Sequence, residues 1–193
     1  MNRSRLFLAV AVLGIMPLTA GAQGLTIKGG LSYGAIPNNN GALPGKLSAH
    51  SGVAFGLGVA TGGTIGLGAE ALYAQRGFKS SVPGNSQKLQ YVDVPVYLRF
   101  ALPTPAISPF AYVGPQLSYE LKCDTDGVID CPSGRDKLTY AGVIGAGLKF
   151  AALHGISVEG RYVYGLSDLK MGTVSNTDNY KSRSFMLLAG IGF

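Results

Sequence analysis

Residues 185–193 read Phe-Met-Leu-Leu-Ala-Gly-Ile-Gly-Phe and close the chain. Successive side chains of a strand point to opposite faces, so Phe185, Leu187, Ala189, Ile191 and Phe193 form one apolar face. A terminal strand of this kind is typical of an outer-membrane β-barrel, whose last strand faces lipid and pairs with the first. We expect Phe185, Leu187, Ile191 and Phe193 to act as a C-terminal assembly signal for the barrel-assembly machinery during biogenesis.

Residues 1–22 have the three parts of a secretory signal peptide. Arg3 and Arg5 form a basic start, residues 6–18 are mostly apolar, and residues 20–22 (Ala-Gly-Ala) form a small-residue cleavage site. The apolar run is shorter than the ~20 residues that span a bilayer, which argues against an uncleaved anchor. We expect cleavage after residue 22 and a single domain over residues 23–193.

The composition excludes several classes of protein. The formal net charge is +6, and the basic residues are scattered, so no run resembles a nucleic-acid-binding patch. Glycine accounts for 29 of the 193 residues, without a collagen period, and falls mainly within strand-like segments. Beyond residue 22 no apolar run is long enough for a spanning helix, so any membrane crossing must use a closed barrel.

Seven further segments alternate between apolar and small or polar residues. They cover residues 25–33, 51–60, 64–76, 89–100, 110–121, 138–150 and 156–165. Long polar connections at 34–50, 77–88, 122–137 and 166–180 alternate with short ones at 61–63, 102–108 and 151–155. Long external loops, short periplasmic turns and an even strand number are typical of bacterial barrels. The sequence therefore predicts an all-β, eight-stranded antiparallel up-and-down transmembrane β-barrel with both termini in the periplasm of a Gram-negative bacterium.

The polar face of these segments carries charges of both signs. The predicted lumen charge network consists of Glu70, Arg76, Asp93, Arg99, Glu120, Lys149, Glu159 and Arg161. A soluble β-sandwich or lipocalin-like barrel would have to bury these charges in its core at a heavy desolvation cost, which favours the membrane barrel. Because the third and fourth segments should be neighbours, we expect Glu70 near Arg99 and Arg76 near Asp93. An eight-stranded lumen is narrow enough for side chains to fill, so a plug is favoured over an ion or proton path.

Aromatic residues stand near the ends of the apolar faces. They are Tyr33, Phe55, Tyr73, Phe100, Tyr119, Phe150, Tyr164 and Phe193. Rings at these positions predict two interfacial girdles around an outer-membrane lipid band.

Three motifs resemble a known family. Residues 67–77 (LGAEALYAQRG), 91–100 (YVDVPVYLRF) and 109–115 (PFAYVGP) resemble strands of the PorT-type outer-membrane β-barrel family, and residues 142–150 and 157–162 fit its last third. The second motif departs from the family pattern by Asp93 for Glu and Arg99 for Lys. The resemblance implies an eight-stranded barrel in a Gram-negative outer membrane, and the family's namesake serves a secretion pathway. A shared fold is a weak guide to function.

The remaining candidate sites are few. Cys123 and Cys131 are an even pair in an exported chain, which predicts a disulfide within the third long connection, with free thiols as the alternative. The acidic run at residues 124–127 lacks the further ligands of a calcium loop, so no metal site and no cofactor are expected. The two histidines, His50 and His154, have no recognisable nucleophile and orienting acid beside them, which argues against an enzyme.

We therefore expect a non-enzymatic outer-membrane barrel with a largely plugged lumen and external loops for surface interaction or envelope integrity. The alternatives are a narrow porin-like channel for small solutes or ions, and an accessory component of a secretion or envelope-assembly complex. The partners expected are outer-membrane lipid and an unidentified surface ligand or secretion partner, and no nucleic acid.

Overall fold

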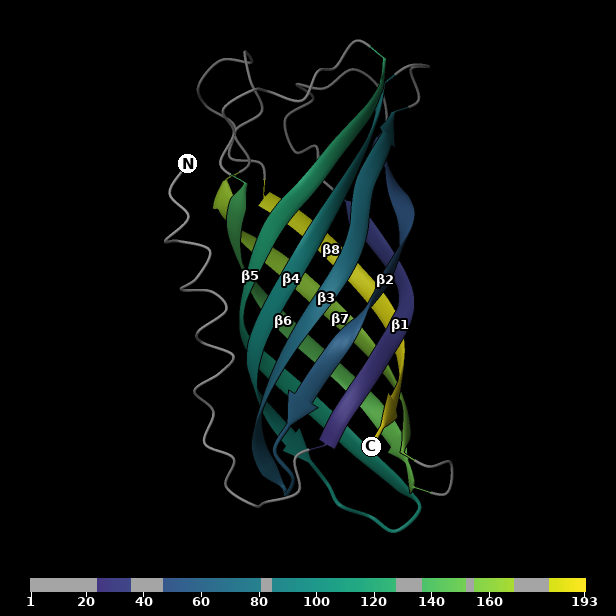
Figure 1. Cartoon of the computed structure of the whole chain (residues 1–193), viewed down its shortest axis with the longest axis vertical. Coiled ribbons are helices and arrows are strands. Elements are labelled where there is room, and N and C mark those ends of the chain that lie inside the picture. Colours follow the sequence, from purple (N-terminus) through teal and green to yellow (C-terminus); the bar gives the residue numbers. More distant parts are fainter. Residues whose placement is uncertain (1–23, 36–46, 81–84, 128–136, 152–154, 169–180) are drawn as a thin grey trace.

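The computed structural model describes residues 24–35, 47–80, 85–127, 137–151, 155–168 and 181–193. Within them, consecutive antiparallel strands form a closed barrel in which the last strand pairs with the first (Figure 1). The strands are β1 (Gly24–Ala35), β2 (Leu47–Ala60), β3 (Ile65–Ser80), β4 (Asn85–Ala101), β5 (Ile107–Gly127), β6 (Leu138–Phe150), β7 (Ile156–Asp168) and β8 (Lys181–Gly192). The predicted eight-stranded up-and-down barrel is confirmed. Residues 1–22, the predicted signal peptide, lie outside the described residues.

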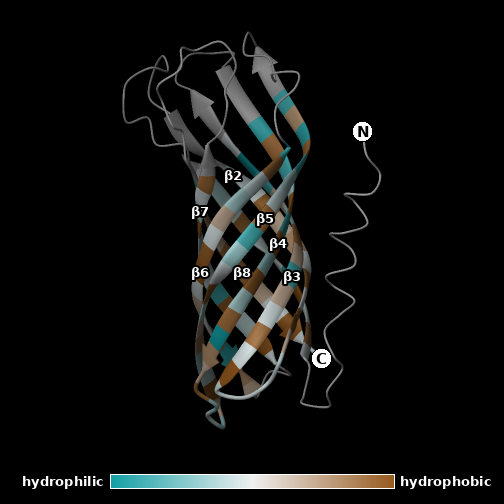
Figure 2. Ribbon diagram, turned by 90° about the vertical axis from the view of Figure 1, so that its left-hand side faces the viewer, coloured by the Kyte–Doolittle hydropathy of each residue, from teal (hydrophilic) through white to brown (hydrophobic). Residues whose placement is uncertain are grey.

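The barrel is apolar on its outside. Leu57, Leu67, Val113, Ile144 and Leu187 point outward, and each is about half exposed. Apolar and polar residues alternate along the ribbons, as the colours in Figure 2 show. No helix among the described residues is long and apolar enough to cross a bilayer.

The pairing of β8 with β1 closes the barrel. Ile191 lies opposite Ile27, Leu187 opposite Leu31 and Phe185 opposite Tyr33, so the apolar face of the last strand continues that of the first. The backbone N–H of Phe193 extends this pairing by donating to the carbonyl of Leu25 at 2.8 Å. Phe185, Leu187, Ile191 and Phe193 all point outward. Their role as an assembly signal stays a prediction.

Most strands, among them β3, β4 and β5, extend further toward the long-connection end than the sequence predicts. The predicted limits near residues 76, 89 and 121 become Ser80, Asn85 and Gly127 in β3, β4 and β5. These extensions are polar and remain paired, with Lys88 opposite Asp124 and Gln87 opposite Thr125. Hydropathy alternation marks the part of a strand that faces lipid, whereas backbone pairing continues into water, so the pattern ends before the strand does.

The short connections lie together at the opposite end of the barrel, with the start of β1 and the end of β8 (Figure 1). Gly63, between β2 and β3, has a φ of 100°, and Gly155, just before β7, has a φ of 77°. Glycine adopts this left-handed conformation without the steric penalty that other residues meet. These two positions allow the chain to reverse tightly.

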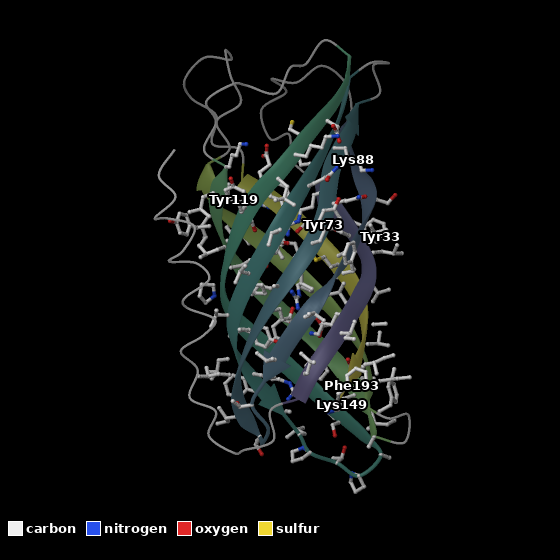
Figure 3. The ribbon with its side chains drawn as sticks, in the orientation of Figure 1. Tyr33, Tyr73, Lys88, Tyr119, Lys149 and Phe193 are labelled. Atoms are coloured by element: carbon white, nitrogen blue, oxygen red, sulfur yellow. The ribbon has the colours of Figure 1, made fainter. Side chains whose placement is uncertain are left out.

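Aromatic residues mark two levels of the wall. Figure 3 shows Tyr33, Tyr73 and Tyr119 toward the long-connection end, whereas Phe193 lies at the short-connection end. Rings at both ends of an apolar band are typical of the two membrane interfaces. Leu57 lies within this band, and Leu121 lies two residues beyond Tyr119.

An arginine on the outer wall should therefore be costly only within the band. Leu57 and Leu121 are 52% and 48% exposed, so Leu57→Arg and Leu121→Arg are matched substitutions. In phospholipid vesicles we expect Leu57→Arg to lower the unfolding free energy by about 2–4 kcal/mol and Leu121→Arg by about 1 kcal/mol or less, because the cost depends on membrane depth. Because the chain contains no tryptophan, unfolding is followed by far-UV circular dichroism during a denaturant titration of each variant. Equal, small losses would indicate an outer wall in contact with water.

Candidate functional site in the barrel lumen

Glycines on the inward face make room for two tyrosines. A Cβ added to Gly68 would lie 2.3 Å from Cε2 of Tyr97, and one added to Gly145 would lie 2.3 Å from Cζ of Tyr112. The absence of a side chain thus lets each ring lie against the neighbouring strand. The two rings, from the adjacent strands β4 and β5, lie side by side in the lumen with their centroids 4.6 Å apart.

Four charged side chains, which we call the ion cluster, meet beside these rings: Lys28 of β1, Glu70 of β3, and Glu159 and Arg161 of β7. Lys28 Nζ lies 2.7 Å from Glu70 Oε1 and 2.7 Å from Glu159 Oε2. Arg161 Nη2 lies 2.5 Å from Glu70 Oε2 and 2.9 Å from Glu159 Oε1. Each cation therefore bridges both carboxylates, and the cluster joins strands from different sides of the barrel.

The two tyrosines complete the cluster. Tyr97 donates its hydroxyl proton to Glu70 Oε1 at 2.7 Å, and Tyr112 donates to Glu159 Oε1 at 2.9 Å. Arg161 Nε donates in turn to the Tyr112 hydroxyl oxygen at 2.8 Å, and its guanidinium lies 5.3 Å from the centre of that ring. All four carboxylate oxygens thus accept at least one hydrogen bond.

Such bonding is what burial of these charges requires. Glu70, Glu159 and Arg161 are at most 2% exposed, and Lys28 is 8% exposed. A buried charge is tolerated only when it is paired and its remaining hydrogen-bonding atoms are satisfied. The cluster carries two positive and two negative charges, so it is neutral as a unit. Apolar side chains pack beside it, including Leu72, Met186 and Leu188.

A second ion pair lies nearer the long connections. Arg76 of β3 pairs with Asp93 of β4, as the sequence predicts, and the Arg76 guanidinium lies 5.2 Å from the centre of the Tyr91 ring. Both members of the pair are buried. This pair involves only neighbouring strands, whereas the ion cluster spans the lumen.

The predicted contact between Glu70 and Arg99 is wrong. Glu70 pairs with Lys28 and Arg161 instead, because these two cations reach it across the lumen. The register offset between Glu70 and Arg99 is four residues, the same as the offset that Arg76 and Asp93 bridge. The Arg99 guanidinium lies 4.9 Å from the centre of the Phe110 ring. Glu120 is buried opposite Tyr91, and Lys149 is exposed at the short-connection end. The eight predicted residues are thus divided among several places along the lumen.

Sequence reasoning missed three members of the site. Lys28, Tyr97 and Tyr112 were not among the eight residues of the predicted lumen charge network, although each alternates with outward apolar neighbours. Lys28 follows the outward Ile27, and Tyr97 lies between the outward Val96 and Leu98. The alternation of outward and inward side chains is the signal that identifies all three as lumen residues.

A cavity of about 330 Å³ occupies the lumen between the ion cluster and the short connections. Lys28, Glu70, Tyr97, Tyr112 and Glu159 line its inner part. Residues near the turns line its outer part: Thr61, Gly62, Lys149, Gly155, Gly192 and Phe193. The cavity is therefore open toward one end of the barrel and bounded at the other by the cluster.

The other predicted sites are only partly described. Cys123 lies within β5 opposite Leu89, not in a connection as predicted, because β5 continues to Gly127. Cys131 lies outside the described residues, so its pairing with Cys123 stays a prediction. The side chain of His50 and all of His154 also lie outside them. Within the described part of the chain, no group of three or more His, Cys, Asp or Glu side chains is placed to hold a metal ion.

Comparison with solved structures identifies the same architecture. Ail, the attachment invasion locus protein of Yersinia pestis, is similar over 88% of this chain and 98% of its own, with a TM-score of 0.52 and 17% identity. OprG from Pseudomonas aeruginosa is similar over 90% and 97%, with a TM-score of 0.52 and 14% identity. The outer membrane enzyme PagL is similar over 86% and 98%, with a TM-score of 0.51 and 20% identity. At these identities the likeness concerns the fold alone.

Sequence comparison gives the family. No curated protein sequence matches the chain. The model of the outer membrane protein beta-barrel domain matches residues 22–171, from just before β1 to beyond β7. With its closed barrel, apolar outer wall and polar lumen, the chain belongs to this family of bacterial outer-membrane β-barrels.

Proposed function

We propose that this protein is a non-enzymatic outer-membrane barrel with a closed lumen, whose long-connection end serves surface interaction or envelope integrity. The observation that carries the proposal is the ion cluster, which joins β1, β3 and β7 across the lumen through contacts of 2.5–2.9 Å. A solute crossing the barrel would have to break this neutral group of paired charges. Leu72, Met186 and Leu188, each under 2% exposed, add an apolar obstruction.

The long-connection end supports the second half of the proposal. There β3, β4 and β5 continue as a paired, polar extension of the wall, with Lys88 at its upper part in Figure 3. Its exposed groups include Lys122 and Asp124, which pair at 2.7 Å. Exposed loops and strand ends on a rigid scaffold are where binding residues concentrate. We therefore orient the barrel with the polar extension toward the cell exterior and both termini toward the periplasm.

Three alternatives remain proposals. A narrow channel is favoured only by the charged, glycine-rich inward face. The PorT-type resemblance supports an accessory role in secretion or envelope assembly, for which co-purification of envelope partners after mild detergent extraction is the test. An enzyme is the least supported, although PagL has a similar fold. A change in the mass of lipid A on overexpression would favour it.

Conductance of the refolded chain in planar bilayers tests the closed lumen. We expect no discrete current steps from protein whose heat-dependent gel shift proves that the barrel is folded, because side chains fill an eight-stranded lumen. Reproducible, salt-dependent steps would overturn the proposal in favour of the channel. A mixture with a known porin, added to the same bilayer, controls for insertion and recording.

Removing one member of a buried pair tests the structural role of the inward charges. Asp93→Ala leaves Arg76 buried without its partner, and we expect the unfolding free energy to fall by about 3–5 kcal/mol. Asp124→Ala is the matched control, because its pair with Lys122 has side chains 41% and 62% exposed and should contribute about 1 kcal/mol or less. Denaturant titration in vesicles compares the two variants. An unchanged stability of Asp93→Ala would show that the pair does not brace the barrel.

A further inference from the structure

We propose that the cavity at the short-connection end is a binding site for a small oxyanion-bearing solute, with a phosphate or carboxylate group held between Arg99 and Lys149. This inference goes beyond the closed lumen proposed above, since a blind cavity binds solute whether or not anything crosses the barrel. It rests on the shape of the cavity and on the distribution of charge along its wall.

The cavity has the size and the opening that a small solute needs. The volume of about 330 Å³ is at the lower end of the range for small-molecule sites, roughly 300–1,000 Å³. Backbone-rich positions such as Gly62, Gly155 and Gly192 line the outer part of the cavity and leave room for a solute. Figure 3 places Lys149 and Phe193 together at this end of the barrel. The site is therefore large enough for a small organic anion and is reached from one side only.

The ion cluster closes the inner end of the cavity. Lys28 and Arg161 are each engaged by both Glu70 and Glu159, and the cluster is neutral. The two tyrosine hydroxyls donate to the same carboxylates. The cluster thus forms a floor of mutually paired charges, although Nη1 of Arg161 has no hydrogen-bond partner among the described residues.

Two cations of the cavity wall, Arg99 and Lys149, are not paired with a carboxylate in the part of the chain that the structure describes. Arg99 of β4 and Lys149 of β6 both line the cavity, and neither forms a salt bridge with a carboxylate of the described residues. They flank β5, where the register places Tyr112 beside Arg99 and Ser108 beside Lys149. Two positive side chains on the wall of one recess concentrate positive potential there, because low-dielectric walls focus the field.

The side chains of Arg99 and Lys149 offer an anion two different kinds of contact. The Arg99 guanidinium lies 4.9 Å from the centre of the Phe110 ring. Stacking uses the flat face of a guanidinium and leaves the N–H donors at its edge for an acceptor such as carboxylate or phosphate. Lys149 Cε lies 3.5 Å from the point that a Cβ on Gly155 would occupy, so the lysine stem lies beside the turn that precedes β7. An oxyanion would receive a directional fork from Arg99 and a mobile point charge from Lys149.

Titration of the folded, full mature barrel in lipid nanodiscs tests the site. Inorganic phosphate and succinate are added separately at constant ionic strength, and NMR shifts are followed for the Arg99 side chain and for the amides of Gly155 and Gly192. We expect saturable shifts at these groups with at least one probe, and the stronger probe identifies phosphate or carboxylate as the preferred group. Shifts that grow linearly with both probes, or saturable shifts only with the cation tetramethylammonium, would overturn the proposal.

Variants separate the site from general electrostatics. Arg99→Gln with Lys149→Gln should weaken binding by about tenfold or more, because charge-assisted hydrogen bonds are lost. Lys122→Gln is the control, since it removes an equal charge from an exposed site on the polar extension of β5 and should leave the affinity unchanged. Equal affinity of the double variant and the unaltered protein would refute the site. If the double variant does not show the gel shift of a folded barrel, the single variant Lys149→Gln, at an exposed position, replaces it. We then expect the affinity for the anion to fall by about threefold or more.

Discussion

The closure of β8 on β1 is the constraint on which the rest of this structure depends. Lipid offers no hydrogen-bonding partners, so each backbone N–H and C=O in the membrane must be paired within the chain. The matched apolar residues of the two strands, such as Ile27 with Ile191, keep the seam continuous with the wall on either side. Once the sheet is closed with so few strands, the outside must be apolar and the lumen must be narrow.

A narrow lumen turns the usual arrangement of a protein inside out. Charges that a water-soluble protein would leave on its surface are here enclosed by the wall, and their burial is compensated by mutual pairing in the ion cluster. Replacement of a buried ion group by apolar residues is often neutral or stabilising, so stability alone does not account for the cluster. Register does: a shift of one residue would turn Glu70 or Arg161 toward lipid, and the cluster therefore favours a single register of β1, β3 and β7 with their neighbouring strands.

The architecture was predictable because two simple periodicities encode it. Alternation located all of the strands, and connection lengths alternated as the barrel requires. The strand ends were less predictable, because β5 continues to Gly127 through polar residues that pair in water. Side-chain partners were the least predictable: Arg76 and Asp93 pair diagonally between adjacent strands, whereas Glu70 meets Lys28 and Arg161 across the lumen. Contacts across the lumen depend on stagger and side-chain reach, which alternation along one strand does not contain.

The two kinds of inward charge differ in where their counter-charges come from. Lys28 and Arg161 lie deep in the lumen, at most 8% exposed, and the chain supplies both of their carboxylates. Arg99 and Lys149 lie two residues beyond Tyr97 and Gly147 on the same faces, where the cavity opens, and the described chain supplies neither with a carboxylate. A cation that needs no internal partner because solvent reaches it contributes little to folding, yet it keeps its full capacity to bind an anion. Within one barrel, this difference separates the charges that hold the wall together from those that remain available to a solute.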